Sequence, residues 1–334
     1  MKIIFYCADK SREHMLAEAL KLGAKVHGDT FEIRRTADYG EALEGPERRY
    51  PGPTPDTDVA CCFGVKGRSR EIVESHRGMG LATLMFDKGY TRSKGEGGHT
   101  EYSRVSVNAP DPTAYMMNVP RKPDRWERLK VTPREYSPNP GGHILICSSS
   151  EKYHDFHRLP PPNEWAVGLV SQIKKMCGNQ IIYRPKPSTT QNQMGVVDTD
   201  DPEELKAALA HYHAVLIRNK SVSGAAFSNG SSKMGDALRG AHCVVTHGSA
   251  AGMDAIIQGV PVVALGRSIA LPVAEKELEK IAKPFWPGDA GRIVWGRALA
   301  YCQWTTAELR SGEAWADLRA EIVRQKSEKK GKAA

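Results

Sequence analysis

Residues 243–266, with the sequence CVVTHGSAAGMDAIIQGVPVVALG, place two apolar runs on either side of a stretch with helical spacing. Short runs that are apolar at every position are typical of strands buried on both faces, and such strands form parallel sheets. Parallel strands need a crossover connection, which is usually a helix. The segment therefore predicts a strand, a turn, a helix and a second strand parallel to the first.

The same alternation of apolar runs and helical stretches occurs in two blocks of the chain. In the first block we expect strands at 2–9, 58–64 and 80–87, helices at 11–23 and 70–76, and a loop-rich stretch at 27–56. In the second block we expect strands at 142–150, 180–185, 243–246 and 260–266, with helices at 163–178, 201–212, 231–241 and 250–259. This order predicts the α/β class, as two Rossmann-like domains that face a central cleft.

Composition along the chain predicts where these domains begin and end. Residues 132–142, TPREYSPNPGG, are rich in proline and glycine, which predicts a linker between a domain at 1–135 and a domain at 143–290. Residues 291–325 read as helices with a break near Gly312, and we expect them to pack back on the first domain. Residues 326–334 are rich in lysine and are expected to form a disordered basic tail.

Charge and cysteine content limit the classes of function. The chain has 334 residues and a formal net charge of +8, and such an excess attracts polyanions such as nucleic acid or acidic glycans. No apolar run approaches the ~20 residues needed to cross a bilayer, and the start, MKIIFYCADK, reads as a strand rather than a secretory signal. The seven cysteines include no CxxC pair, so we expect buried, reduced thiols in a cytoplasmic protein.

The turn inside the 243–266 segment is a candidate for binding a phosphate-bearing ligand. Small residues let the backbone approach a ligand, and free N–H groups at a helix start attract an anion. Ser249 can add a hydrogen bond, and Asp254 can accept bonds from a ribose diol. An ordinary strand–turn–helix would have the same pattern, so both readings stay open. The candidate residues are His247, Gly248, Ser249, Ala250 and Asp254.

Two cations follow the strand at 180–185, in the sequence YRPKP. The prolines on either side of Lys186 restrict the backbone and place Arg184 and Lys186 at the carboxyl end of the strand. Ligands of α/β sheets bind at that edge. An arginine offers a planar fork to phosphate, and a lysine adds a point charge, although a solvated basic turn would have the same sequence.

The order YRPKP and then THGSAAGMDAIIQGVPV resembles the C-terminal domain of GT-B glycosyltransferases, most closely the capsule-polysaccharide Kdo transferases. The motif of that group reads roughly Y-R-x-H-P, followed by T-x-x-S-x-x-x-x-E-A-x-x-x-G-x-P-V. Lys186 stands where the group has His, and Asp254 stands where it has Glu, so CMP-Kdo is not assumed as the donor. The ending LAYCQWTTAELRSGEAW resembles that of phage-encoded proteins of this type.

The resemblance implies a nucleotide-sugar donor on residues 143–290 and an acceptor on residues 1–135. Ser149 and Lys152 follow the first strand of the donor domain, where GT-B loops approach the donor phosphates. They join Arg184, Lys186 and the 247–254 residues as the predicted donor site. A UDP-sugar is favoured, a CMP- or GDP-sugar is the alternative, and no metal is implied.

In the first domain, Asp87 ends a buried strand and is the predicted general base for the acceptor hydroxyl. Glu101 is a competing base, and His99 lies beside it in the same glycine-rich loop. A structural aspartate that caps a turn is the alternative for Asp87. Basic and aromatic side chains after the strands are predicted to contact the acceptor: Lys66, Arg68, Tyr90, Arg92, Tyr102 and Arg104.

Four functions stay open at this point. The first is sugar transfer to a hydroxymethylated pyrimidine in phage DNA, favoured by the net charge and by Trp126 within the basic stretch at 121–130. A base modified in this way would have to flip out of the duplex. The second keeps the fold and takes a glycan or a lipid-linked sugar as acceptor. The third is a non-catalytic DNA-binding module, and the fourth is a UDP-sugar epimerase, which shares the GT-B layout.

Overall fold

The computed structural model describes residues 1–8, 10–39, 52–54, 56–65, 67–91, 99–186, 222, 224–227 and 233–333. They form two compact units, the first made of Met1–Met116 with Ala298–Ala334 and the second of Met117–Arg297. The helix expected at 201–212 lies outside the described residues.

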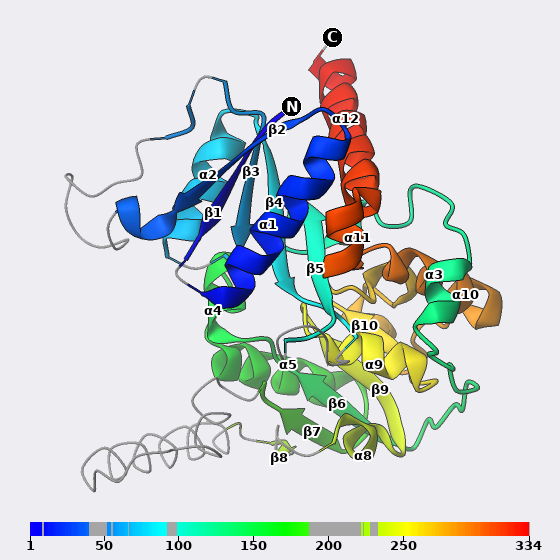
Figure 1. The fold of residues 1–334 in the computed structure, drawn as a ribbon. Coiled ribbons are helices and arrows are strands. Elements are labelled where there is room, and N and C mark those ends of the chain that lie inside the picture. Colours follow the sequence, from blue (N-terminus) through cyan, green and yellow to red (C-terminus); the bar gives the residue numbers. More distant parts are fainter. Residues whose placement is uncertain are drawn as a thin grey trace, which may run out of the picture. The chain divides into compact units, whose positions relative to one another are not determined.

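The first unit has a six-stranded sheet in the order β11-β5-β4-β3-β1-β2 (Figure 1). Strands β1 to β4 are parallel, β5 runs antiparallel to β4, and β11 runs antiparallel to β5. The strands are β1 (Lys2–Cys7), β2 (Thr30–Arg35), β3 (Val59–Phe63), β4 (Ala82–Lys88), β5 (Tyr102–Val107) and β11 (Gln303–Thr305). The helices are α1 (Ser11–Val26), α2 (Arg68–Gly78), α11 (Thr306–Ser311) and α12 (Glu313–Ala333), with 3-10 turns η1 (Thr36–Tyr39) and η4 (Pro112–Ala114).

Helices cover both faces of this sheet because its central strands are apolar on both sides. Along β1, Ile3 and Phe5 belong to the core formed with α1, α11 and α12. Ile4 and Tyr6 point to the opposite face and pack with residues of α2. The expectation that C-terminal helices pack on the first unit is confirmed for α11 and α12, which lie beside α1 (Figure 1). Residues 291–297, which the same expectation included, belong to the second unit instead.

The second unit has a five-stranded, fully parallel sheet in the order β10-β9-β6-β7-β8. Its core packs helix α5 against β6, β7 and β9, as the buried strand pattern requires. The strands are β6 (His143–Cys147), β7 (Ile181–Arg184), β8 (Ala226–Phe227), β9 (Ala241–Thr246) and β10 (Val262–Ala264). The helices are α3 (Asp124–Arg128), α4 (Glu151–Phe156), α5 (Pro162–Met176), α8 (Met234–Leu238), α9 (Ala251–Ile257) and α10 (Gly288–Ala300), with 3-10 turns η6 (Leu271–Val273) and η7 (Leu278–Lys280). Each unit is therefore a Rossmann-like α/β layer, which confirms the predicted fold class.

Three strands of the first unit were not expected from the sequence. β2 lies in the stretch at 27–56, β5 in the polar stretch after residue 91, and β11 before the last two helices. β2 is only half-buried along its length, and β5 alternates polar and apolar residues. Neither gives the continuous apolar run by which the central strands are recognised.

The expected linker at 132–142 is instead part of the second unit. The Arg134 amide donates to the Ile257 carbonyl at 2.8 Å, and Arg292 donates to the Arg134 carbonyl at 2.5 Å. Asn139 Nδ2 donates to the Gly240 carbonyl at 2.8 Å. These hydrogen bonds, each with a backbone carbonyl as acceptor, hold an irregular segment in place, so the second unit begins well before residue 143.

The basic tail at 326–334 is helical through Ala333, where a disordered end was expected. Arg324 pairs with Glu321 one turn before it and with Glu328 one turn after it. Such pairs at three- and four-residue spacing stabilise an exposed helix. The break expected near Gly312 is present, because Gly312 has a φ of 88° and separates α11 from α12.

Helix α1 meets α11 backbone to backbone at Gly23, and we expect Gly23→Ala to be destabilising. A Cβ atom at this position would lie 2.0 Å from the Leu309 carbonyl oxygen. The helices would have to separate, with an expected loss of about 1–3 kcal/mol in the free energy of unfolding. Gly78→Ala is the matched control, because a Cβ there would have no neighbour within 4 Å. Urea denaturation of both variants measures the difference, and equal midpoints would contradict the close packing.

Candidate functional site

The parallel register of the second unit aligns the carboxyl ends of four strands. Cys147 at the end of β6 pairs with Arg184 of β7 and with Thr246 of β9, and Thr246 pairs with Ala264 of β10. The residues that follow each strand therefore leave from one edge of the sheet. This carboxyl edge brings together the Ser149 loop, the turn at 247–250 and the 265–267 loop, and it is where α/β sheets bind ligands.

The turn at 247–250 differs from the sequence prediction in how its backbone amides are used. The Ser249 amide donates to Thr246 Oγ1 at 2.9 Å, and the Ala251 amide donates to Ser249 Oγ at 3.3 Å. Two of the donors expected to face a ligand are thus bonded within the turn. The Ser249 hydroxyl accepts one bond and keeps its own hydrogen for another partner.

The small residues of this turn accommodate a side chain of the protein. A Cβ atom on Gly248 would lie 1.9 Å from Tyr153 Oη, and a Cβ atom on Gly266 would lie 2.1 Å from the His247 ring. Tyr153 Oη lies 3.3 Å from His247 Nδ1, within hydrogen-bond distance. The glycines are therefore required for the packing of Tyr153 and His247.

Three aromatic rings form a cluster above this turn, which we call the Tyr153 cluster: Tyr153, His157 and His247. The ring centroids of Tyr153 and His157 are 4.2 Å apart, and those of His157 and His247 are 5.9 Å apart. Burial, together with repulsion from His247, Arg267 and His154 in their charged forms, lowers the pKa of His157 to about 4. Burial and His154 also lower the pKa of His247. His247 was predicted as a donor-site residue, whereas Tyr153 and His157 were not, because they lie in and just after the short helix α4, which was not expected from the sequence.

The remaining predicted donor residues lie on the same unit but differ in exposure. Arg184 is buried at 5% exposure, and burial lowers the pKa of its guanidinium, opposed by Cys147 and Asp254. Asp254 therefore faces the Arg184 charge from α9. Ser149 is also buried, and its Oγ has no hydrogen-bond partner among the described residues. Lys152 and Lys186 are exposed.

In the first unit, Asp87 lies at the end of β4 and is held by Arg104 of the neighbouring β5. Arg104 donates from Nη2 to Asp87 Oδ2 at 2.6 Å and from Nη1 to Asp111 Oδ1 at 2.6 Å. Burial lowers the pKa of Arg104, but the carboxylates of Asp111 and Asp87 outweigh it and raise the pKa above its ordinary value. The Asp87 side chain is 46% exposed, so it is both fixed in place and open to a ligand.

Several predicted acceptor residues have structural partners instead. Tyr90 is 7% exposed and donates its hydroxyl to Asp111 at 3.3 Å, and Arg104 stacks on its ring. Arg68 is buried and forms an ion pair with Glu71. These three side chains contribute to the packing and ion pairs of the first unit, and their contact with an acceptor stays a prediction. Lys66 and Arg92 lie outside the described residues.

The other candidates, His99, Glu101 and Tyr102, lie at or just before the start of β5. His99 Nε2 lies 3.5 Å from Ser11 Oγ at the start of α1. Glu101 and Tyr102 are half-buried in the same segment, and Tyr102 pairs with Thr305 of β11. Asp87 pairs with Arg104 on β5. Tyr102 lies two residues before Arg104 on that strand, and Glu101 and His99 precede it.

Arg12 and Glu13, at the start of α1, were missed by the sequence analysis, and the Asp87 carboxylate acts electrostatically on Arg12. Arg12 of α1 donates to Thr100 Oγ1 at 2.7 Å and to Ser103 Oγ at 3.1 Å, and it stacks on the Phe63 ring. Glu13 is 5% exposed, accepts a bond from the Ala8 amide at 2.7 Å, and has its pKa raised by burial. Both residues occupy ordinary helical positions. The one sequence signal for Glu13 is that a charged residue stands at a position of α1 that is buried.

The basic stretch at 121–130 does not present its tryptophan to a partner. Trp126 is 8% exposed, and a Cβ atom on Gly296 would lie 2.8 Å from its ring. Arg125 is 3% exposed. Trp126 is therefore packed against α10 and is not presented at the surface of the basic stretch.

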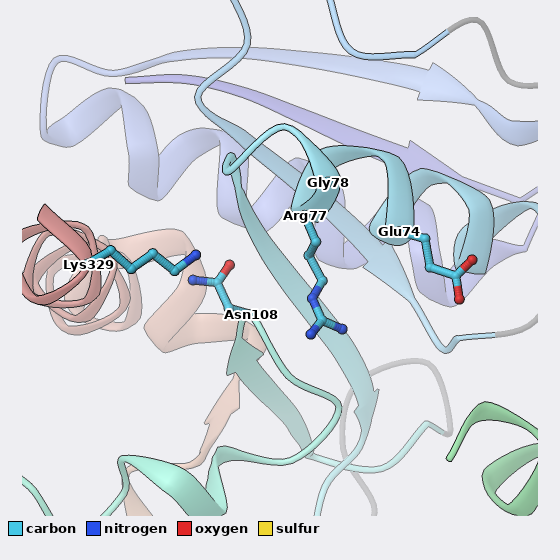
Figure 2. A pocket seen from close by; sticks show the side chains of 5 residues that line it. All are labelled: Glu74, Arg77, Gly78, Asn108 and Lys329. Atoms are coloured by element: carbon cyan, nitrogen blue, oxygen red, sulfur yellow. The ribbon is translucent and has the colours of Figure 1, made fainter. Parts of the chain in front are cut away.

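A hollow of about 460 Å³ lies at the opposite, amino end of β4 (Figure 2). It is lined by Glu74, Arg77 and Gly78 of α2, by Asn108 and by Lys329 of α12. Lys329 points toward the Asn108 amide in Figure 2, and Asn108 Nδ2 donates to Gln325 at 2.8 Å. The hollow is separate from Asp87, which lies at the other end of the same strand.

The described part of the chain contains no group of three His, Cys, Asp or Glu side chains arranged to hold a metal ion. Among the same residues, no helix combines the length and apolar character needed to cross a membrane.

No protein-family model and no curated protein sequence matches the chain. Several solved structures are similar in fold. The β-Kdo 2,4 transferase of KpsC from Thermosulfurimonas dismutans is 12% identical, with a TM-score of 0.47 over 90% of this chain and 98% of that chain. The β-Kdo 2,7 transferase of the same protein is 12% identical, with a TM-score of 0.40 over 95% of this chain and 100% of that chain.

A third similar structure is the UDP-GlcNAc 2-epimerase from Methanocaldococcus jannaschii, at 11% identity and a TM-score of 0.29 over 90% of this chain and 98% of that chain. These identities and TM-scores are low. We therefore argue the function of this chain from its own residues.

We expect Arg104→Ala to destabilise the first unit, because it leaves Asp111 buried without its cation. Asp111 is 5% exposed, and breaking a buried ion pair costs about 3–5 kcal/mol. The partial exposure of the network puts the expected loss at the lower end of that range. Arg104→Lys keeps the charge but cannot bridge both carboxylates, so its stability should lie between that of Arg104→Ala and that of the wild type. Thermal unfolding measures all three, and equal stability of Arg104→Ala and wild type would rule out the bridge.

Proposed function

We propose that the protein is a glycosyltransferase that moves a sugar from a nucleotide-sugar donor to an acceptor hydroxyl. The observation that carries the proposal is the shared carboxyl edge of the second unit. Arg184 and the turn at 247–250, far apart in sequence, leave this edge in register. They are the same two segments whose order resembles the donor domain of GT-B glycosyltransferases.

The chemistry of this edge suits the phosphate of a nucleotide sugar. Arg184, Lys186 and Lys152 supply positive charge, and Ser149 and Ser249 supply hydroxyl donors. A phosphate oxygen satisfies both kinds of group, and a guanidinium pairs with it through two bonds. We assign the donor to this set, and we take a UDP-sugar as the first donor to test, with CMP- and GDP-sugars as alternatives.

In the first unit, we assign proton acceptance to Asp87. The acceptor oxygen forms its bond to the anomeric carbon while its proton passes to the Asp87 carboxylate. The bond between that carbon and the donor phosphate breaks, and the phosphate leaves with the electron pair. The cations of the carboxyl edge would stabilise the developing charge on the phosphate. Arg104 acts as a positioning residue, because it holds Asp87 Oδ2 at 2.6 Å.

Two variants test these assignments separately. Asp87→Asn should abolish sugar transfer and leave donor affinity unchanged, because the amide cannot accept the proton. Arg184→Gln should weaken donor binding by about tenfold or more, as expected for the loss of a charge-assisted bond of about 1.5–3 kcal/mol. Titration calorimetry with UDP-, CMP- and GDP-sugars measures binding, and release of the free nucleotide measures turnover. Turnover by Asp87→Asn at the wild-type rate would remove it as the base.

For the acceptor, we propose a hydroxymethylated pyrimidine in DNA, with host cytoplasm as the compartment of a phage-encoded enzyme. The support is the net charge of +8 and the resemblance of the chain's ending to phage proteins. The burial of Trp126 removes one argument for DNA. A glycan acceptor of the capsule type is the second candidate, because the Kdo transferase resemblance favours it.

One measurement separates these acceptors. We expect nucleosides from hydroxymethylated DNA, incubated with enzyme and donor, to gain the mass of one sugar. Unmodified DNA is the control, because it lacks the hydroxyl. If donor is consumed only when oligosaccharide replaces DNA, the acceptor is a glycan.

A further inference from the structure

The Tyr153 cluster contains a buried histidine nitrogen that makes no hydrogen bond to the described residues. His157 Nε2 is shielded from solvent and has no hydrogen-bond partner among the described residues. The same holds for His154 Nε2, although His154 Nδ1 lies 2.6 Å from the Pro160 carbonyl oxygen. Buried polar groups in proteins are nearly always bonded, and an exception calls for an explanation such as a ligand.

The charged groups that act on His157 come from three segments and are all cationic or able to become so. His154 belongs to α4 itself, His247 to the turn after β9, and Arg267 to the loop after β10. Tyr153 lies against the ring and adds no cation to this set. Arg267 is exposed at the rim of the cluster. Such a surrounding keeps His157 neutral in the free protein and favours an anion.

We propose that His157, His247 and Arg267 form an oxyanion site for the phosphate of the nucleotide donor, and that His157 takes up a proton when the anion binds. This inference rests on the proposed function for the identity of the ligand. The proton comes from solvent and bonds to the neutral imidazole. The resulting imidazolium has two N–H donors, and a phosphate oxygen provides the acceptor that His157 Nε2 lacks.

The close packing of the turn holds these groups together. Gly248 lets Tyr153 lie against the turn, and Gly266 lets the His247 ring lie against the β10 loop. Tyr153 then bridges the two histidines. Its hydroxyl lies 3.3 Å from His247 Nδ1, and its ring centroid lies 4.2 Å from that of His157, with the two rings tilted by 47°. The carboxyl edge thus recognises an anion through side chains, at a turn where the Ser249 and Ala251 amides are already bonded.

The expected pH dependence has a definite sign. The pKa of His157 is lowered to about 4 in the free protein. A bound anion raises it, so the anion binds more tightly as the pH falls from the raised value toward the free value. Each proton taken up makes affinity rise by about tenfold per pH unit within that window.

Inorganic sulfate is the probe, because it stays a dianion over the tested range and any pH dependence belongs to the protein. Titration calorimetry at about pH 7.5 and about pH 5.5, in two buffers of different ionisation enthalpy, gives both affinity and proton uptake. We expect wild-type protein to bind sulfate about tenfold more tightly at the lower pH, with net uptake of protons. His157→Gln should lose this difference, whereas the control His14→Gln, in the first unit, should keep it.

Arg267→Gln is a second variant at an exposed position, and it should weaken sulfate binding about tenfold at the lower pH. Melting curves establish that each variant is folded. Sulfate affinity that does not change with pH, or unchanged behaviour of both His157→Gln and Arg267→Gln, overturns the proposal. Proton-linked sulfate binding without turnover of any nucleotide sugar would leave the site standing and refute the proposed function. Turnover of a nucleotide sugar with pH-independent sulfate binding would support the proposed function and refute the proton-linked anion site.

Discussion

The parallel register of the second sheet is the constraint on which the candidate site depends. Because β7, β6, β9 and β10 end level with one another, the residues that follow Cys147, Arg184, Thr246 and Ala264 leave the sheet at a single edge. Each strand is apolar enough to be buried on both faces, so polar side chains are restricted to the strand ends. The chemistry of this unit is thus confined to that edge by the same pattern that makes the sheet.

Close backbone packing decides what the edge can recognise. A turn of small residues after a strand is usually taken as space for a ligand. Here Tyr153 occupies the space beside Gly248, and the Ser249 and Ala251 amides bond within the turn. Recognition of an anion then falls to side chains that titrate, which couples binding to pH in a way that a backbone site would not.

Much of the fold was predictable from local patterns, and most of the site partners were not. The runs at 58–64, 80–87 and 243–246 correspond to strands β3, β4 and β9, because a short run that is apolar at every position is typical of a strand buried on both faces. Arg104 was predicted beside an acceptor, yet it bridges Asp87 and Asp111. That pairing follows from the register of β4 with β5, a strand without an apolar run, and no local pattern encodes such a register. The segment at 132–142 was misassigned for a related reason. It bonds to the backbone carbonyls of Ile257 and Gly240, which are distant in sequence, and no local pattern predicts such bonds.

The first unit is built from both ends of the chain, and this has a consequence for how the protein is made. Trp304 and Trp315, both fully buried, complete a core begun by β1 and α1. The second unit is continuous and emerges entirely before them. On the ribosome, the sheet face that α11 and α12 later cover must therefore wait with only α1 packed on it while the second unit is synthesised. We therefore expect the first unit to depend more on chaperones and to be more sensitive to premature termination than the second unit, although its synthesis begins first.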